Sequence, residues 1–202
     1  MTDTQKDLPR LIRNLSDPDS AVRRAAAAKI FARGCKLVRP VVERWLAEEE
    51  LARCFVLGPS RSPEETVGLA VEPHNFQRIR AAFVSPPLAV VPPDQDALEF
   101  ELALPAGVRL DILTAREPQG AGAIARFLKK FGEGIQQIEL LVKSVDTAAQ
   151  LLDARFGVAP LFPATRAGAN GTRVNFFLVP LPAGGKVLVE LVEAAAHPHG
   201  LC

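Results

Sequence analysis

The chain has 202 residues, of which 48% are hydrophobic and 23% are charged, and its formal net charge is +1. This hydrophobic content excludes the composition of a disordered chain, and the length allows one large domain or one ordinary domain with a small appendage. The near-zero net charge argues against nucleic acid or an anionic membrane surface as a partner.

The opening segment, MTDTQKDLPR, is polar and predicts no signal peptide. The most apolar region, residues 174–192, is interrupted by prolines, glycines and charged residues, so it is not expected to span a membrane as a helix. The three cysteines, Cys35, Cys54 and Cys202, are odd in number and far apart, which favours reduced thiols over a disulfide framework. Together these features predict a cytoplasmic protein.

Residues 6–50 are predicted to form three helices. The first has apolar residues at the spacing of one helix face: Leu8, Leu11, Ile12 and Leu15. After the turn SDPDS, an alanine-rich second helix is expected to end near Gly34, because glycine suits a C-terminal cap. A third helix has an apolar stripe over residues 38–46.

The pattern L-x-D-P-D-x-x-V-R-R-A-A-A-x-x-I in this region resembles one HEAT repeat. A single such unit rarely buries enough apolar surface by itself. We therefore predict that residues 1–56 form a small all-helical cap that packs on the rest of the chain. A protein-docking role is the alternative, and a large exposed apolar stripe would favour it.

After a linker-like segment at residues 58–65, the same order of elements occurs twice. The first pass is expected to contain strand 66–71, a helix near 73–83, and strands 87–91, 97–104 and 108–113. The second is expected to contain strand 137–142, helix 146–156, and strands near 159–162, 172–179 and 186–192. A helix in GAGAIARFLKKFG joins the two.

The repeated order predicts an α+β fold of two paired βαβββ units, residues 66–113 and 137–192, within a domain spanning residues 62–193. Each curved sheet alone has an apolar face to bury, so the two units should pair through their sheets. The cleft between them is then the natural site for a small-molecule ligand.

Four segments, RLDIL, IARFLKKFGEGIQQIELLVKSVDTAAQLL, GANGTRVNFF and GGKVLVELVE, resemble methylmalonyl-CoA epimerases in order and spacing. These enzymes belong to the vicinal oxygen chelate superfamily, which also contains glyoxalase I. The loop GANGTRVNF and the final VLVEL are the most specific part of the resemblance. The first unit matches in outline, and residues 1–60 lie outside the resemblance.

The resemblance implies a divalent metal between the units, with two ligands from each unit. The epimerase pattern is His, then Gln or Glu, then His, then Glu. The corresponding residues in this sequence are Thr66, Asp111, Gln137 and Glu190. Both histidine positions are therefore changed, and Gln137 is preceded by a second glutamine, Gln136.

The sequence leaves open what these four residues, which offer only oxygen atoms as ligands, do in the folded protein. The set suits a weakly bound Mg²⁺, Mn²⁺ or Ca²⁺ ion, since imidazole ligands for transition metals are absent. Alternatively, Gln137 and Thr66 hydrogen-bond Asp111 and Glu190 directly and fill the site. No other cofactor is expected, and a register error in the first unit is a third explanation.

Three carboxyl groups are candidates for acid–base chemistry. Without a cation, repulsion between Asp111 and Glu190 would raise one pKa, which makes Glu190 a candidate. Glu99 and Glu101 share one face of the expected strand 97–104, where the resemblance implies a second acid–base carboxylate. A solvent-facing polar edge is the alternative explanation for this pair.

The main hypothesis is a small-molecule-binding protein of this superfamily whose metal centre is degenerate. The first alternative is an active epimerase, isomerase or lyase that acts on a carboxylate or acyl-CoA substrate, with a hard divalent metal or none. The second is an interaction protein that uses its helical segment. A homodimer is compatible with each of them.

Overall fold

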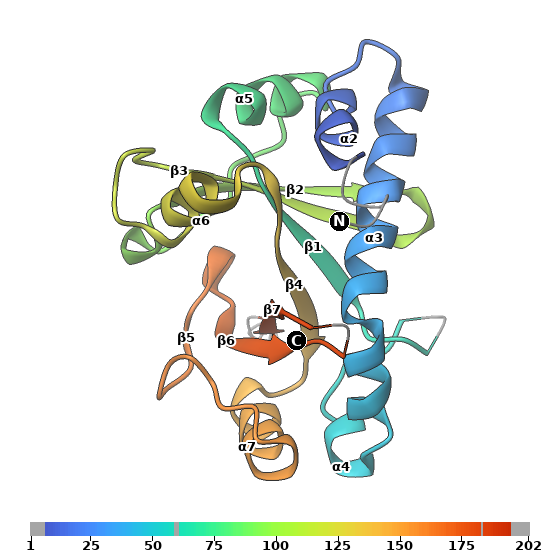
Figure 1. Cartoon of the computed structure of the whole chain (residues 1–202), viewed down its shortest axis with the longest axis vertical. Coiled ribbons are helices and arrows are strands. Elements are labelled where there is room, and N and C mark those ends of the chain that lie inside the picture. The colour runs from blue at the N-terminus through green and yellow to red at the C-terminus, as the bar shows by residue number, and fades with distance from the viewer. Residues whose placement is uncertain (1–6, 59–60, 183, 195–202) are drawn as a thin grey trace, which may run out of the picture.

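Seven strands form one strongly curled sheet in the computed structural model, which describes residues 7–58, 61–182 and 184–194 (Figure 1). The strand order is β2-β3-β1-β4-β7-β6-β5. The strands are β1 (Glu65–Ala70), β2 (Ala97–Leu104), β3 (Val108–Ala115), β4 (Gly134–Val142), β5 (Arg166–Ala167), β6 (Arg173–Pro180) and β7 (Lys186–Glu193). The predicted α+β fold is confirmed.

The two halves of the sheet meet at its centre, where β1 and β4 pair in antiparallel fashion. On its other side each of these strands pairs in parallel with the last strand of its own half, β1 with β3 and β4 with β7. Because a parallel pair needs a crossover, each half also contains a helix, α5 (Pro73–Ala82) or α7 (Val145–Phe156). A third helix, α6 (Ala123–Phe131), connects the halves.

Two of the expected strands are not formed. Residues 87–91 make no strand, and the backbone there gives β2 one hydrogen bond, from Ala89 N to the Glu99 carbonyl (2.9 Å). Prolines surround this segment, and their missing N–H groups prevent a longer ladder. Residues 159–162 are reduced to an isolated bridge between Pro160 and Phe177.

The N-terminal region differs from the prediction in its number of helices. It contains α2 (Leu8–Asn14), α3 (Ser20–Leu46) and the short α4 (Glu49–Ala52), so the expected second and third helices are one. Gly34 is a buried position inside α3 rather than a cap. A Cβ atom there would lie 2.5 Å from Val67 Cγ2, so the glycine is explained by close packing on the sheet.

Helix α3 lies along the seam between the two halves of the sheet (Figure 1). Its buried residues belong to one continuous hydrophobic cluster with the outward-facing residues of the strands, including Val67 and Ile138. The apolar stripe of residues 8–46 is thus largely used inside the protein, which removes the feature that would favour a docking role for it. The boundary of a separate helical segment at residue 56 stays a prediction, as does the HEAT-like character.

Alternation along the strands separates the two faces of the sheet. Residues such as Val67 and Ile138 pack against α3, while α5 and α7 join the same cluster on the outer side. The opposite, inner face has a smaller cluster where α6 covers β1 and β3. No helix in the described parts of the chain is long and apolar enough to cross a membrane. Cys35 and Cys54 are buried free thiols, and Cys202 lies outside the described residues.

Candidate functional site

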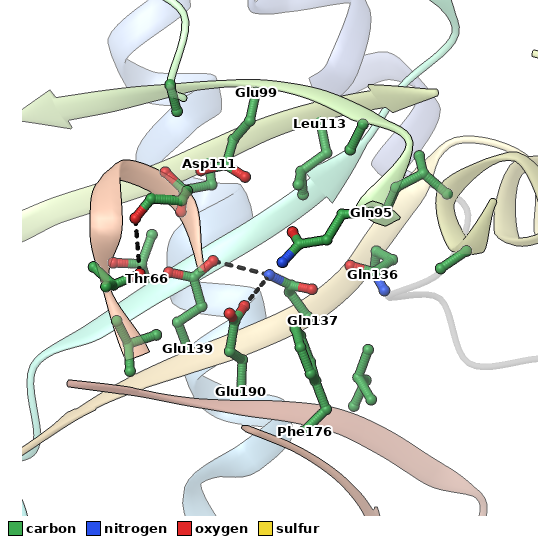
Figure 2. A pocket seen from close by; sticks show the side chains of 18 of the residues that line it. Thr66, Gln95, Glu99, Asp111, Leu113, Gln136, Gln137, Glu139, Phe176 and Glu190 are labelled. Carbon is green, nitrogen blue, oxygen red and sulfur yellow. Dashed lines mark hydrogen bonds between the residues drawn. The ribbon is translucent and has the colours of Figure 1, made fainter. Parts of the chain in front are cut away.

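A cavity of about 960 Å³ occupies the inner face of the curled sheet and is lined from both halves. The four positions of the implied metal site all line it: Thr66 on β1, Asp111 on β3, Gln137 on β4 and Glu190 on β7 (Figure 2). All four are buried, with exposed fractions between 6% and 8%. The structure therefore brings together the residues that the sequence singled out.

A β-bulge explains why two consecutive glutamines point into the same cavity. Gly68 of β1 pairs with Gln137, but the next residue, Leu69, pairs with Ile135, so Gln136 is an extra residue in β4. A bulged residue escapes the strict alternation of a strand, and both Gln136 and Gln137 line the cavity. A Cβ atom at Gly68 would lie 2.5 Å from Gln137 Cγ, so glycine leaves the room that Gln137 occupies.

The amide nitrogen of Gln137 bridges two carboxyl groups. Nε2 donates to Glu190 Oε2 at 2.5 Å and to Glu139 Oε1 at 3.0 Å (Figure 2). Glu139 lies two residues after Gln137 on the same face of β4. The bridge links the last strand of the second half to the centre of the sheet and fixes the direction of the Gln137 amide.

Four carboxyl groups line this part of the cavity: Glu99, Asp111, Glu139 and Glu190. Burial raises the pKa of Glu99 to about 8, with further contributions from the charges of Asp111 and Glu101. Burial also raises the pKa of Glu139 to about 8, helped by the charge of Glu190 and opposed by hydrogen bonds from Asp111 and Gln137.

The other two carboxyl groups are perturbed in the same direction. Burial raises the pKa of Asp111 well above its ordinary value, and the charge of Glu139 and a hydrogen bond with that carboxyl add to this effect. Burial and the charges of Glu99 and Asp111 do the same to the pKa of Glu190. Because these groups favour their protonated forms near neutral pH, the cluster is able both to donate and to accept protons.

The structure separates the two candidates on β2. Glu101 has a partly exposed side chain and pairs with Arg109, whose Nη2 lies 2.9 Å from Glu101 Oε1. Glu99 has no such partner among the ion pairs of the described residues. Glu99 is thus the β2 carboxyl with the properties of an acid–base group, and Glu101 is held at the edge of the cavity.

The donor set fits the implied metal poorly in this arrangement. Gln137 directs its amide nitrogen toward the carboxyl groups, and an amide N–H is a donor rather than a metal ligand. Within residues 7–58, 61–182 and 184–194, no group of three or more His, Cys, Asp or Glu side chains is placed to hold a metal ion. No chemical step is therefore assigned to a metal.

Apolar side chains and paired arginines complete the wall of the cavity. The apolar members include Leu88, Leu113, Leu161, Phe176 and Leu188. Arg166 stacks on Phe162, with 4.2 Å between its guanidinium carbon and the ring centroid, and it also pairs with Asp94. The cavity thus has an acidic inner part and an amphipathic surround.

Gln136 and Glu139 are two polar residues of the cavity that the implied set of metal ligands does not include. Glu139 could be found by alternation, because residues 137 and 139 of one strand share a face. Gln136 could not, because its orientation depends on the bulge in the pairing with β1.

No protein-family model and no curated protein matches this chain. Solved structures do. The methylmalonyl-CoA epimerase of Mycobacterium tuberculosis is 31% identical, with a TM-score of 0.53, over 64% of this chain and 86% of that chain. A variant of the Streptomyces coelicolor methylmalonyl-CoA epimerase in complex with 2-nitronate-propionyl-CoA is 25% identical, with a TM-score of 0.53, over 71% of this chain and 96% of that chain. A methylmalonyl-CoA epimerase in complex with methylmalonyl-CoA and NH₄⁺ is 26% identical, with a TM-score of 0.52, over 66% of this chain and 95% of that chain.

The chain is 31% identical to the Mycobacterium tuberculosis epimerase over 86% of that enzyme. Together with the curled sheet, this similarity shows that the protein belongs to the vicinal oxygen chelate superfamily. Within that superfamily, the solved structures it resembles include several methylmalonyl-CoA epimerases. About a third of this chain has no counterpart in those alignments.

Proposed function

We propose that this chain binds a small molecule in the cavity between its two halves, and that its metal centre is degenerate. The observation that supports this most directly is the amide of Gln137, which donates to both Glu139 and Glu190. This amide is therefore engaged with two carboxyl groups through its nitrogen and does not present its oxygen to a shared cation with Glu190. The changed residue at position 66, a threonine with a weak hydroxyl donor, supports the same conclusion.

The second candidate function is metal-independent proton transfer next to a carbonyl group, as in an epimerase or isomerase. The raised pKa of Glu99, about 8, favours it, because a group that titrates near the working pH exchanges protons efficiently. A carboxylate would remove the proton, and a protonated carboxyl such as Asp111 would donate a hydrogen bond to the enolate oxygen. An acyl-CoA substrate, which two of the epimerase structures contain, is the first to test.

The metal proposal is tested by restoring the two imidazoles. We expect wild-type protein to be purified with substoichiometric transition metal. Thr66→His combined with Gln137→His should raise the affinity for Co²⁺ or Ni²⁺ by orders of magnitude, because each imidazole replaces a weak neutral oxygen donor. Calorimetric titration and the visible spectrum of bound Co²⁺ measure metal binding by the wild type and by the double mutant.

The matched control is Lys129→His combined with Gln150→His, two exposed positions on α6 and α7, helices that contain no histidine. It should bind these metals no better than the wild type. Tight, stoichiometric Zn²⁺ or Co²⁺ in the wild-type protein would contradict a degenerate centre. A restored double mutant that also fails to bind would contradict the convergence of positions 66 and 137.

The catalytic candidate is tested separately by incubating the protein with methylmalonyl-CoA in D₂O. Loss of the proton signal at the carbon between the two carbonyl groups, followed by NMR, reports proton transfer directly. Activity that Glu99→Gln reduces at least tenfold would support this function. A protein that binds the compound without exchange would be a binding protein only.

A further inference from the structure

Two segments from opposite halves of the chain connect the two edges of the curled sheet, β2 and β5. Residues 87–95 precede β2, and Ala89 N donates to the Glu99 carbonyl of that strand (2.9 Å). Residues 166–172 contain β5 and the turn that leads into β6. Members of both segments line the cavity, and Figure 2 shows Gln95 among the side chains that point into it. We call these two segments the clasp.

Asn170 is at the centre of the contacts that hold the clasp together. Val90 N donates to Asn170 Oδ1 (2.9 Å), and Asn170 N donates to the Val90 carbonyl oxygen (3.0 Å). Nearby, Gln95 Nε2 donates to the Ala167 carbonyl oxygen (3.0 Å). Each of these hydrogen bonds joins the first half of the chain to the second. The clasp therefore closes the curled sheet around the cavity.

The contacts across the clasp are exposed to solvent. This holds for the side-chain hydrogen bonds and for the ion pair between Arg166 and Asp94. Val90 is 76% exposed, and each segment contains one buried residue, Val91 or Gly168. Exposed ion pairs contribute little to stability. A region with few buried contacts and exposed hydrogen bonds opens locally at low cost, so the clasp is able to part without unfolding of the sheet.

The backbone just before the first segment has an uncommon conformation. Val84 and Ser85 both have positive φ angles, 63° and 53°. Glycine adopts this left-handed region freely, whereas a residue that is branched at Cβ, such as Val84, is an outlier there. Strained positions of this kind persist where neighbouring contacts hold them, and they are often found at switch regions. Rotation at residues 84 and 85 would relieve the strain and move residues 87–95 away from the cavity.

We infer that the clasp is the gate of the cavity, which parts between Val90 and Asn170 to admit a ligand and closes behind it. The inference rests on the proposed function, namely that the cavity binds a small molecule. Asn170 is the residue on which closure depends most, because it contributes both a side-chain acceptor and a backbone donor across the clasp. Closure separates a bound ligand from bulk water.

The reaction of a thiol inside the cavity with a bulky reagent tests the gate without any ligand. Leu188→Cys places a thiol in the cavity wall on β7, and Gln150→Cys places one at an exposed position on α7. Both proteins also carry Cys202→Ser and are reacted with fluorescein-5-maleimide. The cavity thiol should react at least tenfold more slowly than the exposed one. Methyl methanethiosulfonate, a small reagent, should show a smaller difference.

Opening the clasp should remove this protection. Asn170→Gly combined with Gln95→Ala deletes two side-chain contacts and keeps a residue that tolerates positive φ at position 170. In the Leu188→Cys protein, this pair of substitutions should accelerate labelling by the maleimide at least tenfold. Asn170→Asp alone, which keeps an oxygen acceptor for Val90 N, should leave the labelling rate unchanged.

The buried native thiols of Cys35 and Cys54 provide the control for unfolding. Peptide mass mapping locates the label at each position. Both thiols should stay slow to react in every variant, because a gate opens locally and leaves the core closed. Faster labelling that extends to both thiols would indicate general unfolding and would contradict a local gate.

Two other outcomes would overturn the inference. Equal labelling of Leu188→Cys and Gln150→Cys by the maleimide would mean that the cavity is open without any movement of the clasp. A labelling rate that does not respond to Asn170→Gly with Gln95→Ala would place the entrance elsewhere. Neither outcome bears on the proposed function, which is tested separately by the binding of methylmalonyl-CoA.

Discussion

Gly34 of α3 and Val67 of β1 approach so closely that a Cβ atom at position 34 would lie 2.5 Å from Val67 Cγ2. Val67 is paired with Ile138 across the junction of β1 and β4, and Ile138 Cδ1 would lie 3.0 Å from the same Cβ. The helix therefore packs on the seam between the two halves more closely than a side chain at position 34 would allow.

Gly34→Ala should destabilise the protein, although alanine is the better helix former by about 1 kcal/mol. The added methyl group has no space, and overpacking of a core typically costs about 1–3 kcal/mol. Urea unfolding measures the change. The control is Ala32→Gly at an exposed position of the same helix, which should show the ordinary loss of about 1 kcal/mol. A stabilised Gly34→Ala variant would contradict the packing described here.

Deleting residues 1–56 should give an aggregation-prone or less stable protein. The deletion exposes the outer apolar face of β1 and β4, and it removes backbone hydrogen bonds to β4 such as Val56 N to the Leu141 carbonyl (3.0 Å). Deleting residues 1–46 keeps those hydrogen bonds and isolates the effect of α2 and α3. Unchanged melting temperature and solubility in both truncated forms would show that the helices are an independent module.

Periodicity was sufficient to predict most of the fold. Strand alternation and helical spacing identify β1, β2, β3, β4, β6 and β7, together with the three helices that accompany them. The error at Gly34 has a physical cause, because a glycine in sequence looks the same whether it ends a helix or allows close packing. The prediction of a strand at residues 87–91 was wrong because the prolines in and around this segment lack the N–H donors that a strand needs.

The resemblance to the epimerases supplied the four positions of the candidate site, and the repeat supported them, but neither gave its internal geometry. Equivalent positions in the two halves place Thr66, Asp111, Gln137 and Glu190 in one cavity. The bulge at Gln136 and the direction of the Gln137 amide depend on pairing between strands that are about 70 residues apart, which no local pattern encodes. No local pattern distinguishes Glu99 from Glu101 either, because both lie on the same face of one strand.

The two adjacent glutamines should respond differently to loss of the amide. Gln137→Leu removes the donor shared by Glu139 and Glu190 and should reduce the free energy of unfolding by about 1–3 kcal/mol. Gln136→Leu removes a buried oxygen that has no partner and should be neutral or stabilising. Urea unfolding of both variants at the same pH tests this. Equal losses would indicate that the Gln137 bridge contributes nothing specific.

Burial of Glu99 should make the protein less stable as the pH rises. Its pKa is about 8 in the folded protein, against an ordinary value of 4.5. Below pH 4.5 the carboxyl is protonated in both states, so it has no effect on the folding equilibrium. Between pH 4.5 and about 8 the unfolded chain releases this proton while the folded protein keeps it, so the free energy of unfolding falls across this window and levels off above it.

Glu99→Gln should therefore gain stability relative to the wild type between pH 5 and pH 8, because the neutral amide has no proton to lose. Urea unfolding at several pH values across this range gives the comparison. Glu117→Gln, which removes an exposed carboxyl, should follow the wild-type curve. Parallel curves for wild type and Glu99→Gln would mean that Glu99 is solvated and ionised in the folded protein, and the acid–base role proposed for it would then fail.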